Sequence, residues 1–309
     1  MPTFTADGPV RMSAPPPRTR ASRWLSARAR LAAALQGGEA SAAGDAAAEA
    51  NGGVDTPPAP PEVPPGWLTG PPDFVGVGFQ RCGTTRWYNL ITAHPEVARP
   101  VAMKELHFFD RFHSGGFVEG DVAAYHSYFP RPEGQVVGEW TPLYASAPWI
   151  PPLLARAAPD ARLLMIVRDP VERLSSGLAL DEAVAGRRGL PLSRYAPLAA
   201  FVRGLYFGEL SVLQRHFERS RILVLQYERC AADPQAELRR TFAFLGLRED
   251  APVTGLEAHP RRRDEKPQFD PGTRAAYVDA YREDVEHLAE AFPEIDLSLW
   301  PNFAHLVRG

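Results

Sequence analysis

Residues 78–85 have the composition and spacing of a phosphate-binding loop. The sequence Gly-Phe-Gln-Arg-Cys-Gly-Thr-Thr lies between an apolar run typical of a buried strand and a segment with helical periodicity. Backbone N–H groups at such a helix N-terminus can hold a phosphate. The spacing is that of the loop G-x-x-x-x-G-K-[ST], but Thr84 stands where the lysine that contacts the β- and γ-phosphates would be. The segment therefore predicts a ligand with a phosphate but no triphosphate, and an ordinary glycine turn is the alternative.

A second group of reactive side chains lies in residues 104–110. This stretch holds Lys104, Glu105, His107 and Asp110, and apolar residues flank the glutamate. Apolar neighbours can partly desolvate Glu105, and this predicts a competent general base. A surface ion cluster beside a buried pair of phenylalanines is the alternative.

A third group begins where the strongly apolar run 162–167 ends. Arg168 would lie at the carboxyl end of a central strand, where open α/β sheets bind their ligands. Ser176 would lie about two turns into the helix that Asp169 begins. Both side chains could contact one phosphate, the arginine through a charge-assisted fork. The alternative pairs Arg168 with Asp169 or Glu172 and makes Ser176 a small packing residue.

Strands and helices are predicted to alternate along the chain. Strand patterns cover residues 74–79, 136–140, 162–167 and 221–226. Helix patterns cover residues 84–93, 148–157, 170–185, 198–217, 234–245 and 273–292. Alternation of this kind predicts an α/β fold with a doubly wound, mainly parallel sheet flanked by helices. Residues 111–129 and 186–197 are predicted to be mobile loops that line a substrate site.

Composition divides the chain into two parts. Residues 1–70 are rich in Ala, Pro and Gly, and six arginines and one acid fall in residues 1–36. Such a stretch buries too little apolar surface to offset its ordering entropy. We therefore predict a mostly disordered N-terminal extension over residues 1–70 and one globular domain over residues 71–309.

The overall composition excludes several classes of protein. The formal net charge of −3 gives no reason to expect a nucleic-acid partner. Two cysteines, Cys82 and Cys230, exclude a disulfide scaffold and indicate a reducing compartment. No apolar run reaches the roughly 20 residues that span a bilayer, and no signal-peptide pattern opens the chain. These features predict a cytoplasmic protein without a transmembrane segment.

Taken together, the motifs resemble those of the PAPS-dependent sulfotransferases, where PAPS is 3′-phosphoadenosine 5′-phosphosulfate. The likeness covers about residues 72–300 and is closest to the branch with heparan-type and bacterial enzymes. The family's phosphosulfate loop resembles residues 80–85, and its K-E-x-H-F-F segment resembles residues 104–109. Three further segments match in order: G-E-x-[ST]-P-x-Y at 138–144, R-D-P-x-x-R with a following serine at 168–176, and a basic late loop at 262–271.

The resemblance implies a P-loop NTPase-like sulfotransferase fold and a PAPS donor site. The reaction would move a sulfuryl group to an acceptor hydroxyl and leave 3′-phosphoadenosine 5′-phosphate. The implied donor-binding residues are Arg81, Cys82, Gly83, Thr84 and Thr85 at the 5′-phosphosulfate, Arg168 and Ser176 at the 3′-phosphate, and Arg262 and Arg263 in the late loop.

The resemblance also implies roles in catalysis. Glu105 would take the acceptor proton during in-line attack, and Arg81 would face the bridging oxygen that leaves. Lys104 and His107 would orient these groups. The scheme needs no metal.

Three residues depart from the family pattern. Many relatives have lysine where Arg81 stands and glycine where Arg263 stands, and many carbohydrate-directed relatives have a basic residue where Trp140 stands. The predicted absence of a membrane anchor favours a soluble, bacterial-type member.

The acceptor is the least specified part of the prediction. Four aromatic residues, Trp87, Trp140, Tyr144 and Trp149, favour a phenol, lipid or natural-product hydroxyl over a polyanionic glycan. Two other functions stay open: a nucleotide kinase with a degenerate phosphate loop, and a catalytically silent nucleotide-binding protein.

Overall fold

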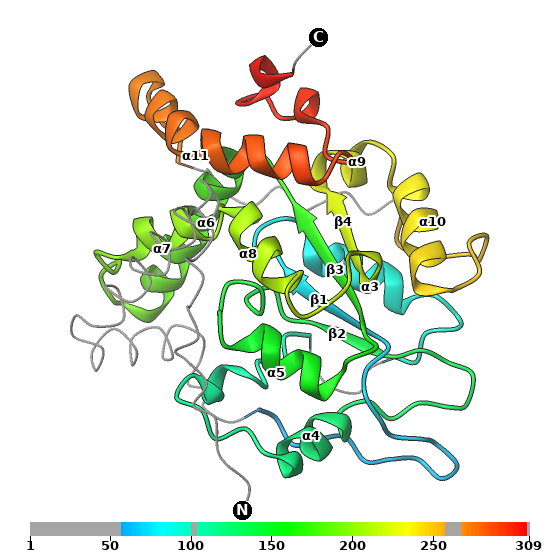
Figure 1. Ribbon diagram of the computed structural model, residues 1–309. Helices are drawn as coiled ribbons and strands as arrows, with labels where there is room; N and C mark the ends of the chain where they lie inside the picture. The colour runs from blue at the N-terminus through cyan, green and yellow to red at the C-terminus, as the bar shows by residue number, and fades with distance from the viewer. Residues whose placement is uncertain (1–56, 100–103, 257–266, 308–309) are drawn as a thin grey trace, which may run out of the picture. The chain divides into compact units, whose positions relative to one another are not determined.

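The computed structural model describes residues 57–99, 104–256 and 267–307. In this part of the chain four parallel strands form one sheet in the order β2-β1-β3-β4 (Figure 1). The strands are β1 (Phe74–Gly78), β2 (Gly138–Trp140), β3 (Arg162–Val167) and β4 (Ile222–Gln226). All their residues except Arg162 are buried, because helices cover both faces of the sheet. The predicted α/β class and parallel sheet are confirmed.

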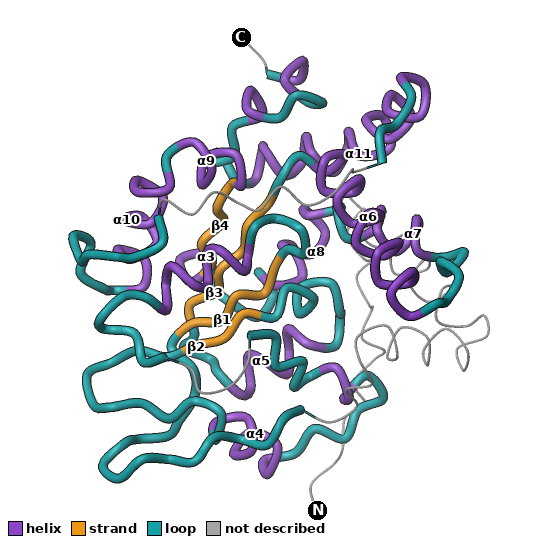
Figure 2. The backbone as a smooth tube through the Cα atoms, turned by 180° about the vertical axis from the view of Figure 1, so that it is seen from behind, coloured by secondary structure: helices purple, strands orange, loops and turns teal. Residues whose placement is uncertain are grey.

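Helices α3 (Thr84–Thr92) and α10 (Pro234–Leu245) cover one face of the sheet (Figure 2). The indole Nε1 of Trp87 joins them by donating to Thr241 Oγ1 at 3.1 Å. Helices α5 (Ile150–Ala157) and α8 (Tyr206–Leu213) lie on the other face (Figure 1). The other α-helices in the part of the chain that the structure describes are α4 (Glu119–His126), α6 (Pro170–Arg188), α7 (Ala196–Val202), α9 (Tyr227–Ala232) and α11 (Pro271–Ala291).

Three helices begin with an Asp-Pro pair. The side chain of Asp169 accepts hydrogen bonds from Val171 N and Glu172 N, so it caps α6 as the sequence predicts. Asp233 and Asp270 cap α10 and α11 in the same way. The cap of α6 matters for function because it directly follows Arg168.

Three helical regions differ from the prediction. The helix expected over residues 198–217 is broken into α7 and α8, because α11 approaches the chain at Gly204. A Cβ on Gly204 would lie 2.8 Å from the hydroxyl of Tyr281. Residues 111–129, expected as a loop, contain α4, whose buried Val122 and Tyr125 anchor it. Helix α9 follows β4 directly and was not predicted.

Residues 57–70, which composition assigns to the extension, contact the domain. Leu68 and Arg131 exchange two backbone hydrogen bonds, of 2.8 and 2.9 Å. The hydroxyl of Tyr128 donates to Pro58 O at 2.5 Å. The rest of the predicted extension, residues 1–56, lies outside the described residues.

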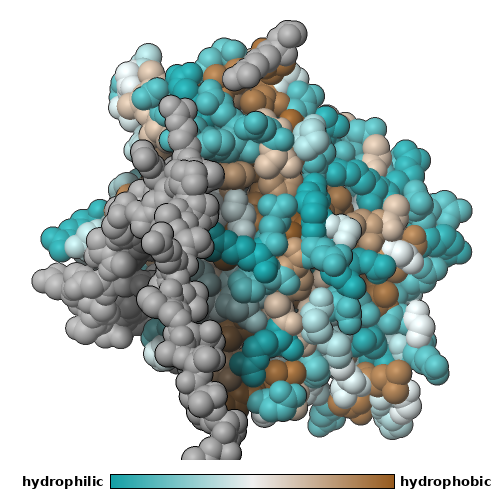
Figure 3. All heavy atoms as spheres, viewed as in Figure 1, coloured by the Kyte–Doolittle hydropathy of each residue, from teal (hydrophilic) through white to brown (hydrophobic). Residues whose placement is uncertain are grey.

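Apolar side chains on the face in Figure 3 are scattered among polar ones. Of the helices that the structure describes, none is by itself long and apolar enough to cross a membrane. Helices α7 and α8 meet that length and composition only as a pair bent by 58°.

Candidate active site

The phosphate loop ends in a tight turn at Gly83, directly before α3. Gly83 is the N-cap of this helix and has a φ of 85°, in the left-handed region. This backbone conformation favours glycine, and a Cβ there would also lie in tight contact with the ring of Tyr227, at 3.1 Å. Thr84 is buried, whereas Gly83 and Thr85 are exposed at the helix N-terminus. The exposed side of this terminus can meet an anion.

The structure brings three of the predicted nucleotide-binding residues together. Arg81 Nε donates to Ser176 Oγ at 3.0 Å, and Arg168 Nη1 donates to Arg81 O at 3.3 Å. These three residues, here the arginine–serine group, come from the loop, from the end of β3 and from α6. Cys82 is buried, and its burial raises the thiol pKa to about 12, so it stays a neutral loop residue.

Arg168 does not make the carboxylate pairs that the alternative reading proposed. Asp169 caps α6, and Glu172 pairs with Arg274 at 3.0 Å. The guanidinium of Arg168 instead lies over the ring of Tyr227, 4.5 Å from its centroid. Within the described residues it is therefore a cation stacked on an aromatic face, with Nη1 on Arg81 O and its other N–H groups left for an anion.

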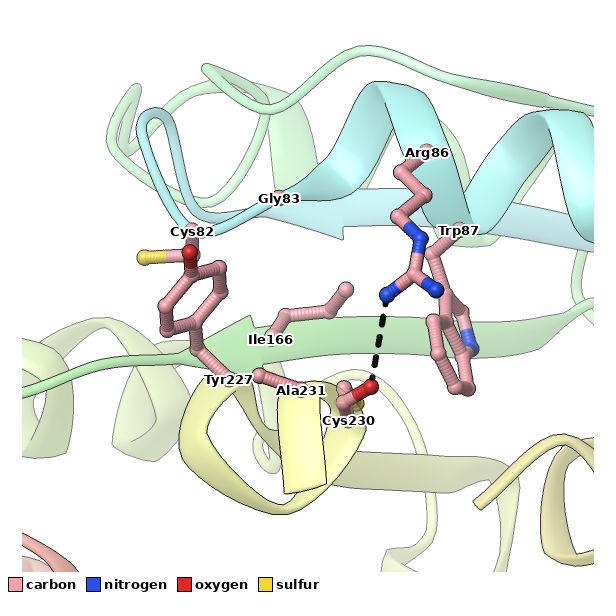
Figure 4. A pocket seen from close by; sticks show the side chains of 8 residues that line it. All are labelled: Cys82, Gly83, Arg86, Trp87, Ile166, Tyr227, Cys230 and Ala231. Carbon is pink, nitrogen blue, oxygen red and sulfur yellow. Dashed lines mark hydrogen bonds between the residues drawn. The ribbon is translucent and has the colours of Figure 1, made fainter. Parts of the chain in front are cut away.

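A pocket lies between the phosphate loop and α9 (Figure 4). Gly83, Ile166, Tyr227 and Ala231 are among the residues that line it. The guanidinium of Arg86 forms part of its wall and donates to Leu256 O at 2.9 Å and to Cys230 O at 3.4 Å. The slot is small, lined mainly by apolar groups, and lies beside the phosphate loop.

The residues of the 104–110 segment form a chain of alternating charges. Lys104 Nζ lies 2.5 Å from Glu105 Oε1, His107 Nε2 lies 3.7 Å from Glu105 Oε2, and His107 Nδ1 lies 2.8 Å from Asp110 Oδ2. We call these four residues the carboxylate group. Asp110 was part of the predicted cluster but was given no role, although its spacing of three residues from His107 was visible in the sequence.

The ion pairs of the carboxylate group determine its protonation. Burial raises the pKa of Glu105, but hydrogen bonds and charges from His107 and Lys104 outweigh it and lower the pKa to about 2. Burial lowers the pKa of His107, but Asp110 and Glu105 outweigh it and raise the pKa to about 9. In this arrangement the ion pairs outweigh the desolvation from which a competent general base was predicted, and the carboxylate is ionised but weakly basic. The role of Glu105 as the base stays a prediction.

The backbone is strained at three predicted catalytic residues. Among the described residues, Arg81, Glu105 and His107 are the non-glycine residues with positive φ, at 70°, 72° and 52°. This conformation is unfavourable for side chains with a Cβ and persists where surrounding contacts impose it. A left-handed residue points its side chain in a direction that a regular helix or strand would not give it, and this applies to Arg81, Glu105 and His107.

A buried network at the end of β2 supports the strained segment. Glu139 is fully buried and accepts hydrogen bonds from Tyr125 OH and Thr141 Oγ1, both at 2.7 Å. Thr141 Oγ1 accepts from His107 N at 3.5 Å, and Tyr144 OH accepts from Phe108 N at 3.0 Å. No role was predicted for Glu139 or Thr141, although both lie in the matched segment 138–144, whereas Tyr144 was interpreted as an acceptor contact.

The two groups lie at the same edge of the sheet. Thr141 N donates to Gly76 O, and Ala145 N donates to Val77 O, each at 2.9 Å. The segment that supports the carboxylate group thus runs beside the end of β1, and β1 continues into the phosphate loop. Residues far apart in sequence meet at the carboxyl ends of parallel strands, where such folds bind ligands.

Most of the predicted acceptor-lining aromatics belong to the core. The side chains of Trp87, Trp140 and Tyr144 are at most 1% exposed, so they cannot contact an acceptor. Trp140 packs against Gly76, where a Cβ would overlap its ring. Trp149 is partly buried and donates to Phe109 O at 3.3 Å. The predicted late-loop residues Arg262 and Arg263 lie outside the described residues.

Comparison with known proteins identifies the family. Residues 71–259 match the model of the sulfotransferase domain, so the chain belongs to the sulfotransferase family. Heparan sulfate glucosamine 3-O-sulfotransferase 3A1 of Mus musculus is 33% identical over 191 residues, 57% of this chain and 46% of that protein. Heparan sulfate glucosamine 3-O-sulfotransferase 6 of Homo sapiens is 34% identical over 188 residues, 57% of this chain and 53% of that protein.

The chain spans about half the length of these curated relatives. Among solved structures, a sulfotransferase from Alicyclobacillus acidocaldarius superposes with a TM-score of 0.56 at 23% identity. The match covers 74% of this chain and 98% of that one, and it confirms the sulfotransferase fold.

Proposed function

We propose that this chain transfers a sulfuryl group from PAPS to an acceptor hydroxyl. The observation that carries the proposal is the meeting of the arginine–serine group and the carboxylate group at one edge of the sheet. One group offers cations and helix N–H groups to a phosphosulfate, and the other offers a proton acceptor.

Each part of PAPS can be assigned to residues in or beside the arginine–serine group. The exposed N-terminus of α3 would hold the 5′-phosphosulfate, and Arg168 with Ser176 would hold the 3′-phosphate. The slot beside Tyr227 would take the adenine. Because Arg81 bonds Ser176 in this structure, the proposal requires Arg81 to exchange that bond for the bridging oxygen of the donor.

The carboxylate group would perform the proton transfer. The acceptor oxygen forms a bond to sulfur while the bond from sulfur to the 5′-phosphate oxygen breaks, and Glu105 takes the acceptor proton. With a pKa of about 2, Glu105 is a weak base while Lys104 lies against it. We propose that Lys104 turns to the incoming sulfuryl group, which raises the pKa of Glu105 at the moment of attack. His107, held by Asp110, keeps the carboxylate oriented.

The acceptor class is proposed from the relatives and from the burial of the aromatics. The names of the relatives specify a glucosamine of heparan sulfate, so a sugar hydroxyl is the first candidate. The argument for an aromatic acceptor weakens because three of its four residues are buried. Trp140 stands where many carbohydrate-directed relatives have a basic residue, but its ring is buried against Gly76, so it gives no information about the charge of the acceptor.

Nothing in the described residues favours the kinase alternative. Thr84 stands in the lysine position and is buried, so it offers no ammonium to a γ-phosphate. A cytoplasmic location, a bacterial-type character and independence from metal remain predictions.

The proposal is tested by titration with 3′-phosphoadenosine 5′-phosphate and with ATP, followed by transfer from radiolabelled PAPS to a panel of sugar, phenol and lipid hydroxyls. Tighter binding of the 3′-phosphorylated nucleotide and transfer in the presence of a chelator are expected. Preference for ATP, or activity that requires magnesium, would contradict it.

A further inference from the structure

The ends of β3 and β4 hold a segment that lies beyond the matched family domain. The match ends at residue 259, and residues 295–303, here the C-terminal segment, follow α11. Gln226, the last residue of β4, exchanges two hydrogen bonds with the backbone of Asp296, of 2.9 and 3.0 Å. Glu228 Oε2 accepts from the indole Nε1 of Trp300 at 2.9 Å.

A second attachment lies at the end of β3. Asn302 donates to Asp169 Oδ2 through its backbone N at 3.1 Å and through its side-chain Nδ2 at 2.9 Å. The other oxygen of Asp169 caps α6. The carboxylate of Asp169 is fully buried, so these hydrogen bonds stabilise a charge that burial disfavours. Asn302 Oδ1 accepts in turn from Arg274 at 3.0 Å.

Arg168 lies between the two attachments. Asp169 follows it in the chain, and the ring of Tyr227, which precedes Glu228, lies against its guanidinium. Asp169 N donates to Glu228 Oε1 at 3.1 Å, which joins the two strand ends directly. The C-terminal segment therefore binds Asp169 and Glu228, which directly follow Arg168 and Tyr227 in the chain.

We propose that the C-terminal segment positions Arg168 for the 3′-phosphate, with Trp300 acting through Glu228 and Asn302 acting through Asp169. Both are positioning residues. A guanidinium fork must be held in one orientation to meet a phosphate with two hydrogen bonds. Arg168 stacks on Tyr227 and makes no carboxylate pair with the residues that the structure describes, so it depends on its neighbours for that orientation. This inference rests on the proposed function, because it takes the 3′-phosphate as the ligand of Arg168.

The test compares two nucleotides that differ only in the 3′-phosphate. Trp300→Phe removes the indole N–H and keeps an aromatic ring in the buried site, and Asn302→Ala removes the carboxamide. His305→Ala, an exposed side chain close to the same segment, is the matched control. Titration with 3′-phosphoadenosine 5′-phosphate and with adenosine 5′-phosphate gives the two dissociation constants, and thermal melting reports folding.

We expect Trp300→Phe and Asn302→Ala each to weaken binding of the 3′-phosphorylated nucleotide about tenfold. Binding of adenosine 5′-phosphate should change less than about twofold, and His305→Ala should change neither. In an Arg168→Ala background Asn302→Ala should add no further loss, because the residue through which it acts is gone.

The outcomes separate this inference from the proposed function. If Arg168→Ala leaves the ratio of the two affinities unchanged, the proposed 3′-phosphate site is wrong. If Arg168→Ala changes the ratio but Trp300→Phe and Asn302→Ala do not, or weaken both nucleotides equally, the positioning role is overturned. Should Asn302→Ala fail to fold, Trp300→Phe decides the question.

Discussion

The two halves of the site are built in different ways. Two members of the arginine–serine group are placed by regular elements, with Arg168 directly after β3 and Ser176 inside α6, whereas Arg81 lies in the phosphate loop. The carboxylate group lies on a segment without regular structure, and two of its residues have left-handed backbone. Strand ends and helix caps therefore position the first group, whereas the buried hydrogen bonds of Glu139, Thr141 and Tyr144 position the second.

Because the two groups are held in different ways, we expect substitutions in them to affect different properties: nucleotide binding for the first group and catalysis for the second. Changes in the first group should alter nucleotide affinity with little effect on the fold. Changes in the second group or in its buried support should alter turnover, and the support should also alter stability. Four predictions test this separation, from the largest expected effect to the smallest.

Glu105→Gln should lower kcat by about 10²–10⁴-fold, because glutamine keeps the shape of glutamate but cannot take a proton. Steady-state kinetics with labelled PAPS measures the loss. Nucleotide affinity should stay the same, which assigns Glu105 to chemistry. Near-normal turnover on a weakly acidic acceptor would place the base elsewhere, and His107 would then be examined.

Arg168→Ala should weaken binding of 3′-phosphoadenosine 5′-phosphate by about 2–4 kcal/mol, the scale of a lost charge-assisted fork. Adenosine 5′-phosphate, titrated in parallel, should be affected far less. Equal losses for the two nucleotides would mean that Arg168 supports the fold and that the first group is not a specific 3′-phosphate site.

Tyr144→Phe should destabilise the protein by about 1–3 kcal/mol, because the buried N–H of Phe108 loses its acceptor. The turnover number should fall as well, while donor affinity stays unchanged, since the network supports only the carboxylate group. Chemical denaturation and kinetics measure the two effects, with Tyr277→Phe on α11 as the control. A stable variant with normal turnover would show that the network does not hold the catalytic segment.

The pH dependence of stability should report on the ion pairs that His107 makes in the carboxylate group. The pKa of His107 is raised from 6.5 to about 9, so its stabilisation is complete below pH 6.5 and is lost as the pH rises through 9. The loss should be at most about 3 kcal/mol, and each kcal/mol lost lowers Tm by about 2–4 °C for a domain of this size. Thermal melts between pH 6.5 and 9.5 would show it, and His107→Gln should flatten the curve. If the difference in Tm between the wild-type protein and His107→Gln stayed the same across this pH range, the charged state of His107 would be contradicted.

Much of the arrangement follows from local sequence. The apolar runs before residues 78 and 168 predict β1 and β3, and the Asp-Pro pair at Asp169 predicts the start of α6, because these signals depend on neighbours in the chain. The positions of Arg81, Arg168 and Ser176 follow from them. The resemblance to the sulfotransferases implied what these residues do. The sequence itself shows that Lys104, Glu105, His107 and Asp110 lie in one short segment.

Other features depend on contacts between distant residues. The break between α7 and α8 arises where Tyr281 of α11 meets Gly204, and nothing near Gly204 in sequence indicates it. Trp140 was interpreted as an acceptor contact, yet its ring fills the space left by Gly76 on the neighbouring strand.

By itself, the sequence determined the parallel α/β fold, the family and the identity of the charged residues at the site, because periodicity, caps and motif spacing are local properties of the chain. Only the tertiary structure decided how basic Glu105 is, since its pKa reflects the balance between burial and the ion pairs to Lys104 and His107. It also decided that Trp300 bonds Glu228 and that Asn302 bonds Asp169. The first pair is separated by 72 positions in the sequence and the second by 133, so both hydrogen bonds depend on how the folded sheet brings its strand ends together.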